Sequence, residues 1–202
     1  MAAHSETDVR SRILRAAEEH FGERSYERTR VADVARAAGI ATGSFYRYFP
    51  SKRALISELL RELGRELRWE MRVAIGDATR QPERERLAFT AFFAFLRRHP
   101  HLFRIQRQVE FVDSAAFREY FEELARRYAR GAKDAMVRGE VDPRFDPDFL
   151  ALTIYIGVPH FVGLRWVEWS GGAAVPEDII EQVFLLLQKS LRPEPAGAGG
   201  SP

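Results

Sequence analysis

A short segment near the N-terminus concentrates hydroxyl, guanidinium and glycine groups that suit contacts with nucleic acid. Residues 42–49 read Thr-Gly-Ser-Phe-Tyr-Arg-Tyr-Phe. On a helix, Phe45 and Phe49 lie one turn apart on a common face, which we expect to be buried. The hydroxyls of Tyr46 and Tyr48 then point elsewhere and can reach phosphates, while the other polar groups remain for base edges or the DNA backbone. The candidate DNA-binding residues of this segment are Thr42, Gly43, Ser44, Tyr46, Arg47 and Tyr48.

Gly43 and two flanking cations complete this candidate site. Because Gly43 has no side chain, the start of its helix could approach a sugar-phosphate chain closely. Lys52 is expected in the first turn of the following helix, where backbone N–H groups and a cation can hold a phosphate together. A cation there is mildly unfavourable for the helix dipole, which favours a functional reason for it. Arg30 belongs to the same basic segment and joins the candidate set.

The charge of the chain is unevenly distributed. The net charge is only +2. Residues 24–53, however, hold seven basic and two acidic residues, a local charge of +5 that leaves −3 for the remainder. A basic patch confined to one segment is what a polyanion-binding module needs. On charge alone, a solvated arginine-rich surface is an equal alternative.

Other chemistries are excluded by what the sequence lacks. There is no cysteine, which rules out disulfides, thiolate zinc sites and cysteine nucleophiles. The chain contains no Gly-x-Ser-x-Gly elbow, P-loop or zinc-binding helix motif, and its carboxylates form no recognisable pair. We therefore expect no enzyme activity, no metal site and no cofactor. Residues 1–10 carry charges and no apolar core, so no secretory signal is expected and the predicted location is the cytoplasm.

Aromatic residues crowd the C-terminal two thirds of the chain. Large rings leave irregular gaps when they pack, which suits an apolar pocket, although an ordinary core position is the commoner role for any single ring. Two polar side chains, Arg107 and His160, are candidate anchors for a ligand. The candidate ligand-binding residues are Phe92, Leu96, Phe103, Arg107, Phe121, Ile154, His160 and Phe161.

Helical periodicity extends over nearly the whole chain, with no alternating strand pattern and no internal repeat. About nine helices are predicted, near residues 9–21, 30–38, 42–49, 51–78, 81–98, 102–112, 114–139, 149–169 and 176–191. Residues 193–202 are rich in Pro, Gly, Ala and Ser, which predicts a disordered tail.

The second and third predicted helices carry the candidate DNA site. Each is too short to be stable alone, and a link containing Gly39 joins them. Thr29 is a plausible N-cap for the first of the pair. This is the helix-turn-helix arrangement, in which the second helix enters the major groove while the first braces it. Short helix–glycine–helix units also occur in structural proteins, so the turn alone is weak evidence.

The run from Thr29 to Lys52, TRVADVARAAGIATGSFYRYFPSK, resembles the signature of the TetR family of transcriptional regulators. The resemblance covers about residues 7–60, and beyond it only the layout of helices is similar. It implies that the recognition-helix positions touch DNA, namely Thr42, Gly43, Ser44, Tyr46 and Tyr48, and that Lys52 contacts a phosphate. The sequence departs from the pattern at Ala41, where many members have a serine cap, and at Arg30, where a threonine is common.

The last two predicted helices are strongly apolar. Residues 150–164 are apolar enough to raise a membrane interpretation, but the stretch is too short for a span and contains Pro159 and His160. A buried helix is the better interpretation. The final helix has a broad apolar stripe, so these two helices expose more apolar surface than one bundle can cover. We expect them to form a twofold dimer, which would place two recognition helices on a palindromic operator.

Together these features predict an all-α protein with an N-terminal helix-turn-helix head and a helical body. The DNA-binding domain is expected over residues 1–53, continuing into the linking helix from residue 51. The ligand-binding and dimerisation domain follows over residues 54–192, before the tail at 193–202. The predicted function is a cytoplasmic homodimeric repressor, released from double-stranded operator DNA by an apolar effector of fatty-acyl, aromatic or multidrug-like type. The alternative is a helical ligand-binding or scaffold protein without a DNA role.

Overall fold

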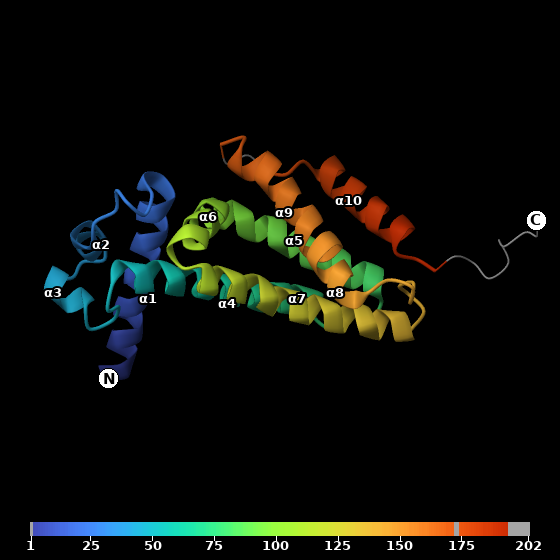
Figure 1. The fold of residues 1–202 in the computed structure, drawn as a ribbon, viewed down its shortest axis with the longest axis horizontal. Coiled ribbons are helices and arrows are strands. Elements are labelled where there is room, and N and C mark those ends of the chain that lie inside the picture. Colours follow the sequence, from blue (N-terminus) through green and yellow to red (C-terminus); the bar gives the residue numbers. More distant parts are fainter. Residues whose placement is uncertain (1, 172–173, 194–202) are drawn as a thin grey trace, which may run out of the picture. The chain divides into compact units, whose positions relative to one another are not determined.

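The computed structural model describes residues 2–171 and 174–193, and over these ranges the chain contains helices and no strands (Figure 1). The helices are α1 (Ala2–Arg24), α2 (Val31–Ala37), α3 (Thr42–Phe45), α4 (Lys52–Ile75), α5 (Gln81–Arg98), α6 (Leu102–Val112), α7 (Ser114–Val137), α8 (Pro147–Leu150), α9 (Val158–Gly163) and α10 (Glu177–Ser190). A π-helical segment, Ala151–Gly157, joins α8 to α9, and a second one, Leu164–Glu168, extends α9, so that Pro147–Glu168 is one continuous helix. The described residues thus form nine helices, and the predicted all-α fold is confirmed.

The helices divide into two compact units. The first contains residues 1–66 and 99–120, and therefore α1, α2, α3, α6 and the first parts of α4 and α7. The second contains residues 67–98 and 121–202, with α5, α8, α9, α10 and the remainder of α4 and α7. The predicted head, residues 1–53, lies inside the first unit, which also includes α6 because α6 packs on α1. Apart from Pro193, the predicted tail lies outside the described residues.

The core of the first unit is built from the apolar faces of its short helices. Phe45 and Phe21 are completely buried, and Phe49 is 3% exposed. The rings of Phe45 and Phe49 lie 5.9 Å apart between centroids, which confirms the predicted shared inner face. Burying a phenylalanine contributes about 1.5–3 kcal/mol. Helices α2 and α3 are thus held by this core and not by their own short hydrogen-bond ladders.

The helix boundaries follow local chemistry, with one correction. Gly39 adopts a left-handed φ of 69° at the turn, and the Ser51 hydroxyl caps α4 by accepting from the N–H of Ala54 at 3.0 Å. Thr29, however, is not the N-cap of α2. That position belongs to Arg30 without a side-chain bond, while the buried Thr29 hydroxyl lies 2.7 Å from the carbonyl oxygen of Ser25. The hydroxyl must find a partner within the core, which draws it away from the helix end.

Helix α3 is shorter than predicted, because it ends at Phe45 and the chain continues as turns through Tyr48. The N–H groups of Tyr48 and Phe49 both reach back to the Phe45 carbonyl, at 2.9 and 3.1 Å. Pro50 explains the early end, since proline disfavours helical geometry in the residue before it and has no N–H to continue the ladder.

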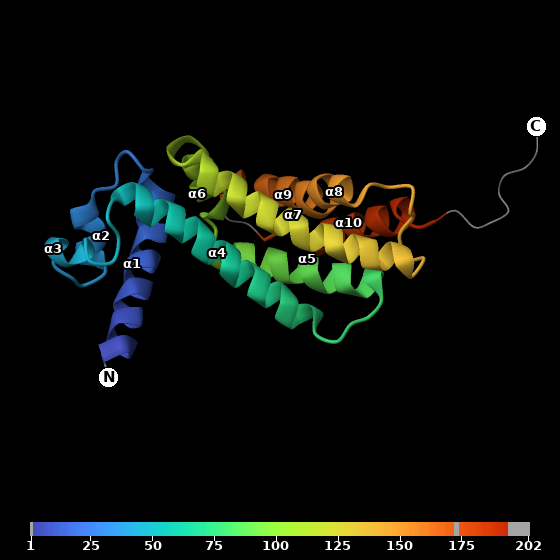
Figure 2. The same cartoon turned by 60° about the horizontal axis from the view of Figure 1, so that its bottom comes forward.

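The second unit is a helical body in which α5 contacts both α9 and α10 (Figure 1, Figure 2). Phe89 of α5 and Phe184 of α10 stack with centroids 6.0 Å apart. The continuous helix Pro147–Glu168 is long and apolar enough to cross a membrane by length and composition, a test that core helices of soluble proteins also pass. It buries Leu150 and Tyr155 in this unit. Only 39% of its most apolar window is buried, however, so much of the apolar surface of this helix is exposed.

Candidate DNA interface and ligand cavity

The polar side chains of residues 42–48 lie on the accessible side of the helix-turn-helix. Thr42, Gly43 and Arg47 are exposed, and the Tyr46 side chain is 55% exposed. Ser44 and Tyr48 are half-buried. This arrangement follows from the inward anchoring of Phe45 and Phe49, which turns the intervening positions outward. The six predicted residues of this segment are thus exposed or half-buried, and Arg30 is exposed as well.

Gly43 is a glycine that the protein itself does not require. A Cβ built there meets no atom within 4 Å, and its φ is not in the left-handed region. Gly22 is a useful contrast, because a Cβ at that position would lie 2.1 Å from the His101 side chain. Packing thus accounts for Gly22, whereas Gly43 leaves room for the close approach of an external partner.

Lys52 has an intramolecular role that the sequence did not reveal. Its Nζ donates hydrogen bonds to the carbonyl oxygens of Tyr26 and Thr29, at 2.6 and 3.0 Å. The ammonium also lies 4.2 Å from the centroid of the Tyr26 ring, a cation–π geometry. Lys52 therefore ties the start of α4 to the loop between α1 and α2. Its predicted phosphate contact stays a prediction.

Two arginines of the basic segment, residues 24–53, are paired with acids through exposed guanidinium groups. Arg36 lies 3.0 Å from Asp33, and Arg53, whose side chain is 62% exposed, lies 3.4 Å from Asp113. Exposed pairs of this kind contribute about 0–1 kcal/mol. Such guanidinium groups can exchange an internal carboxylate for a phosphate at little cost.

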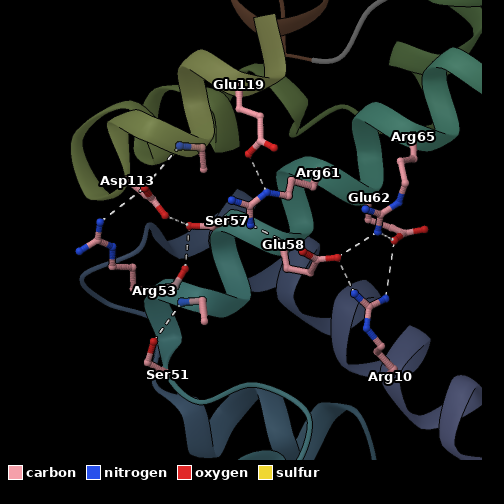
Figure 3. Close-up of polar contacts among 12 residues, drawn as sticks. Arg10, Ser51, Arg53, Ser57, Glu58, Arg61, Glu62, Arg65, Asp113 and Glu119 are labelled. Atoms are coloured by element: carbon pink, nitrogen blue, oxygen red, sulfur yellow. Dashed lines mark hydrogen bonds and ion pairs between the residues drawn. The ribbon is translucent and has the colours of Figure 1, made fainter. Parts of the chain in front are cut away.

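A polar network behind the surface joins the first turns of α4 to the start of α7 (Figure 3). The Ser57 Oγ lies 2.7 Å from Asp113 Oδ2, and its proton is shared with the Arg53 carbonyl at 3.0 Å. Asp113 also caps α7 by accepting from the N–H of Ala116 at 3.4 Å. The hydrogen bond from Ser57 is the main cause of a lowered pKa for the Asp113 carboxyl. Asp113 therefore holds the base of the helix-turn-helix as an ionised carboxylate.

A second part of this network joins α1 to α4. Arg10 donates to Glu58 at 2.6 Å, and Arg65 donates to the same carboxylate at 3.0 Å (Figure 3). Partial burial alone would raise the pKa of Glu58, but the hydrogen bonds and positive charges of Arg65 and Arg10 outweigh it and lower that pKa. These contacts orient α4 against the first helix.

The second unit contains a partly open cavity of about 320 Å³, within the size range of small-molecule sites. Its apolar wall comes from α4, α5 and α7, through Met71, Ile75, Ala88, Phe89 and Leu124. Tyr128 and Tyr155 add a pair of stacked rings, with centroids 5.3 Å apart and planes inclined by 8°. The cavity is therefore shaped for flat or extended apolar groups.

Three buried polar side chains interrupt this apolar wall. The Tyr155 hydroxyl donates to Glu85 Oε1 at 2.9 Å, and Gln81 Nε2 donates to the same oxygen at 3.1 Å. Glu85 is 7% exposed and Gln81 8%. Burial raises the pKa of Glu85 despite the hydrogen bonds from Tyr155 and Gln81, and the nearby charge of Glu140 raises it further. Burial and Glu85 together also raise the pKa of Tyr155.

The remaining lining residues give the cavity a positive charge. Five arginines contribute to its wall, namely Arg68, Arg72, Arg84, Arg127 and Arg130, against the single carboxyl of Glu85. Arg72 and Arg130 are exposed. Arg127 pairs with Glu123 at 3.4 Å, across accessible side chains. An anionic group on a ligand would find several guanidinium partners here.

The eight residues predicted to bind a ligand lie elsewhere. Phe103 and Arg107 belong to α6 and the first unit, whereas the other six belong to the second unit. The structure brings three of them together, since the His160 ring lies 6.0 Å from Phe121 and 5.8 Å from Phe161. None of the eight lines the 320 Å³ cavity. Their ligand role stays a prediction.

Sequence reasoning missed the polar residues of the cavity for an identifiable reason. Gln81 and Glu85 are one turn apart at the start of α5, where polar residues are normally exposed. Tyr155, their partner, is 70 residues further along the chain from Glu85. The only signal available from the sequence was a tyrosine within an otherwise apolar helix.

Exposed apolar side chains also occur on this unit, and this set is called here the apolar face. Its residues come from the helix Pro147–Glu168, its C-cap and α10, namely Phe149, Leu152, Phe161, Trp169, Leu185 and Leu186. Each of these side chains is at least half exposed, from 52% for Leu186 to 66% for Phe161 and Trp169. Large apolar side chains that are exposed in such number are candidates for an interaction site.

Comparison with known proteins gives consistent results. The family described as "Bacterial regulatory proteins, tetR family" matches residues 13–59. The HTH-type transcriptional repressor KstR2 of Rhodococcus jostii is 29% identical, and the match covers 87% of both chains. Its counterpart from Mycolicibacterium smegmatis is 26% identical over 88% of both chains.

Solved structures share the fold at lower identity. The fatty acid degradation regulator FadR from Bacillus halodurans has a TM-score of 0.80 at 20% identity, over 92% of this chain and 97% of that one. FadR from Bacillus subtilis, solved in complex with stearoyl-CoA, has a TM-score of 0.78 at 19% identity, over 90% of this chain and 99% of that one.

Proposed function

This chain belongs to the tetR family of bacterial regulatory proteins, and on that premise we propose that it is a ligand-responsive repressor which binds a palindromic operator as a homodimer. The observation that carries the proposal is the outward polar surface of residues 42–48 above the buried Phe45 and Phe49. In this reading, α3 and the turn after it enter the major groove while α2 braces them. The protein acts in the cytoplasm, where operator DNA is located.

Some of the candidate residues position the protein on the DNA backbone, and others recognise the base pairs. Tyr46, Tyr48 and Arg30 contact phosphates, which sets the register of the protein on the duplex. Thr42, Ser44 and Arg47 face base edges, where hydroxyl and guanidinium groups can distinguish base pairs. The uncovered backbone at Gly43 lets the helix approach the sugar-phosphate chain.

The test is selection of DNA fragments by the purified full-length protein, followed by sequencing and band-shift assays. We expect a palindromic or near-palindromic motif, with affinity that falls steeply as salt is raised because bound counterions are released. Tyr46→Ala and Arg47→Ala should weaken binding. Arg97→Ala removes the same charge from an exposed position on α5 and should leave binding unchanged. Failure to select any sequence would favour the alternative, a helical ligand-binding or scaffold protein without a DNA role.

Dimerisation is assigned to the apolar face on the helix Pro147–Glu168 and α10. A self-complementary contact would bury its exposed side chains and place the two heads on half-sites about one DNA turn, or a multiple, apart. Leu185→Glu should shift the protein to monomer in analytical ultracentrifugation. Val137→Glu is the matched control, because Val137 is 89% exposed on α7 and lies outside the apolar face. A dimer that survives Leu185→Glu and Phe161→Glu would refute this assignment.

The cavity of the second unit is the proposed effector site. Its apolar wall and five arginines suit a ligand with an apolar body and an anionic end, such as a fatty acid, an aromatic acid or an acyl-CoA. The complex of Bacillus subtilis FadR with stearoyl-CoA supports this class. Such a ligand releases the operator only if it binds the DNA-free conformation more tightly than the DNA-bound one.

A panel of fatty acids, aromatic acids and acyl-CoAs tests this site by thermal shift and by release of bound operator. Gly131 lines the cavity, and a Cβ there would meet no atom within 4 Å. Gly131→Phe should therefore fill the cavity and abolish the ligand response while operator binding is kept. A response that persists unchanged in Gly131→Phe would move the effector site elsewhere.

A further inference from the structure

One acceptor atom in the wall of the cavity is left without a hydrogen bond. Among the described residues, Gln81 Oε1 is buried and has no hydrogen-bond partner. The residue as a whole is 8% exposed, and its Nε2 donates a hydrogen bond to Glu85. Native proteins rarely bury such an acceptor unsatisfied, because the loss of its solvation is costly. Gln81 is a lining residue of the cavity, so a small shift of its side chain would present this atom to a bound molecule.

The neighbours of Gln81 fix the kind of group that is missing. The hydrogen bonds that Glu85 receives, from Tyr155 and from Gln81, both fall on Oε1. The local acceptors are thus a carboxyl and an amide carbonyl, and the Tyr155 proton is already used. A ligand O–H or N–H would satisfy Gln81 Oε1, which a ligand carbonyl or ether could not do.

The charges on the wall decide between a neutral donor and a cation. Five arginines line the same cavity, and their combined field opposes a ligand ammonium. Burial also favours the uncharged form of Glu85, the carboxyl that lines the cavity, which weakens its attraction for a cation. A neutral hydroxyl meets neither obstacle.

Resting on the proposed function of this cavity as the effector site, we propose that the effector is a hydroxylated amphipathic anion. Its hydroxyl donates to Gln81 Oε1, its apolar body packs against Phe89 and the stacked tyrosines, and its carboxylate or phosphate pairs with the wall arginines. At about 30 Å³ for each water-sized group, a cavity of about 320 Å³ holds roughly ten non-hydrogen atoms. A free medium-length hydroxy acid has about this size, whereas the coenzyme part of a thioester would have to lie outside the cavity.

The experiment compares matched ligands on the full-length protein by isothermal titration calorimetry. The probes are ω-hydroxydecanoate, decanoate and ω-aminodecanoate, together with the corresponding octanoates, which vary the distance between the two ends. At one chain length at least, the hydroxy acid should bind at least about fivefold more tightly than the plain acid and the amino acid, because a site with an unpaired polar group discriminates strongly. Equal or weaker binding of the hydroxy acid at both lengths overturns the inference.

Two variants test whether Gln81 causes the preference for the hydroxy acid over the plain acid. Gln81→Leu removes the unpaired acceptor and should abolish the preference for the hydroxy acid. Tyr155→Phe removes a neighbouring hydroxyl but keeps Gln81, so the preference should persist. A preference that survives Gln81→Leu in a folded protein overturns the assignment. If Gln81→Leu does not fold, the comparison of ligands on the unchanged protein still decides.

The readouts separate this inference from the function on which it rests. Equal binding of both acids, with operator release by each, refutes the hydroxyl requirement and leaves the repressor proposal standing. If another anion of the panel releases the operator and no hydroxy acid binds, the hydroxyl requirement is likewise refuted and the repressor proposal still stands. If the protein selects no DNA, the proposed function is refuted, whichever ligand the cavity binds.

Discussion

Replacing Lys52 with methionine separates a structural role from a DNA-binding role at one position. Methionine keeps an unbranched, flexible side chain of similar length, so the packing of the lysine stem is largely preserved. The variant loses two charge-assisted hydrogen bonds, to the carbonyls of Tyr26 and Thr29 at 2.6 and 3.0 Å, and a cation–π contact at 4.2 Å.

The expected loss of stability follows from these contacts. A hydrogen bond to a charged group has a net value of about 1.5–3 kcal/mol, and an accessible cation–π contact about 0.5–1 kcal/mol. Lys52 is half-buried, so water replaces part of what is lost. We therefore expect the free energy of unfolding to fall by about 2–3 kcal/mol in Lys52→Met, because two carbonyls in the loop before α2 lose a shared donor.

Urea unfolding followed by circular dichroism measures this change, and band shifts at two salt concentrations measure DNA binding. Tyr46→Phe is the matched control, because it keeps the edge contact with Phe45 at 5.3 Å and removes only an exposed hydroxyl. Its stability should stay within about 0.5 kcal/mol while operator affinity falls. Unchanged stability in Lys52→Met, together with a salt slope reduced by about one, would refute the structural role and identify Lys52 as a phosphate ligand.

Three further predictions concern single side chains. Gly43→Ala should leave the free energy of unfolding unchanged or raise it by about 0.5–1 kcal/mol, because its Cβ meets open space, while operator affinity falls; full affinity in band shifts would show that no close approach occurs. Asp113 has a lowered pKa, so its ionised form stabilises the fold above the unfolded value near 3.8. Asp113→Asn should cost about 1 kcal/mol at neutral pH in urea unfolding, and a cost that did not shrink toward pH 3 would contradict the role of the charge. Glu85 has a raised pKa, so its contribution to stability is present below the unfolded value near 4.5 and is lost as the pH rises through the folded value. Glu85→Gln should therefore gain stability relative to the parent protein as the pH rises from 4 to 8, and a pH-independent difference would rule out this explanation.

Local sequence determined most of the secondary structure and the identity of the DNA-binding segment. The spacing of Phe45 and Phe49, the left-handed turn at Gly39 and the cap at Ser51 all depend on residues within a few positions of one another. Such features are readable because helix periodicity and capping are short-range effects. The early end of α3 was missed although Pro50 is a local signal, and the role of Thr29 was misjudged because its hydroxyl bonds to the carbonyl oxygens of His20 and Ser25.

The position and the lining of the cavity are determined by tertiary structure alone. Glu85 and Tyr155 are far apart in sequence, and only the packing of α5 against the helix Pro147–Glu168 buries them together and leaves an acceptor of Gln81 unpaired. In the same way, Lys52 is an ordinary surface cation until the fold brings the carbonyls of Tyr26 and Thr29 within its reach. A sequence specifies which groups a chain carries and the periodicity of its helices. The solvation and partners of those groups are set by long-range packing, which no local pattern encodes.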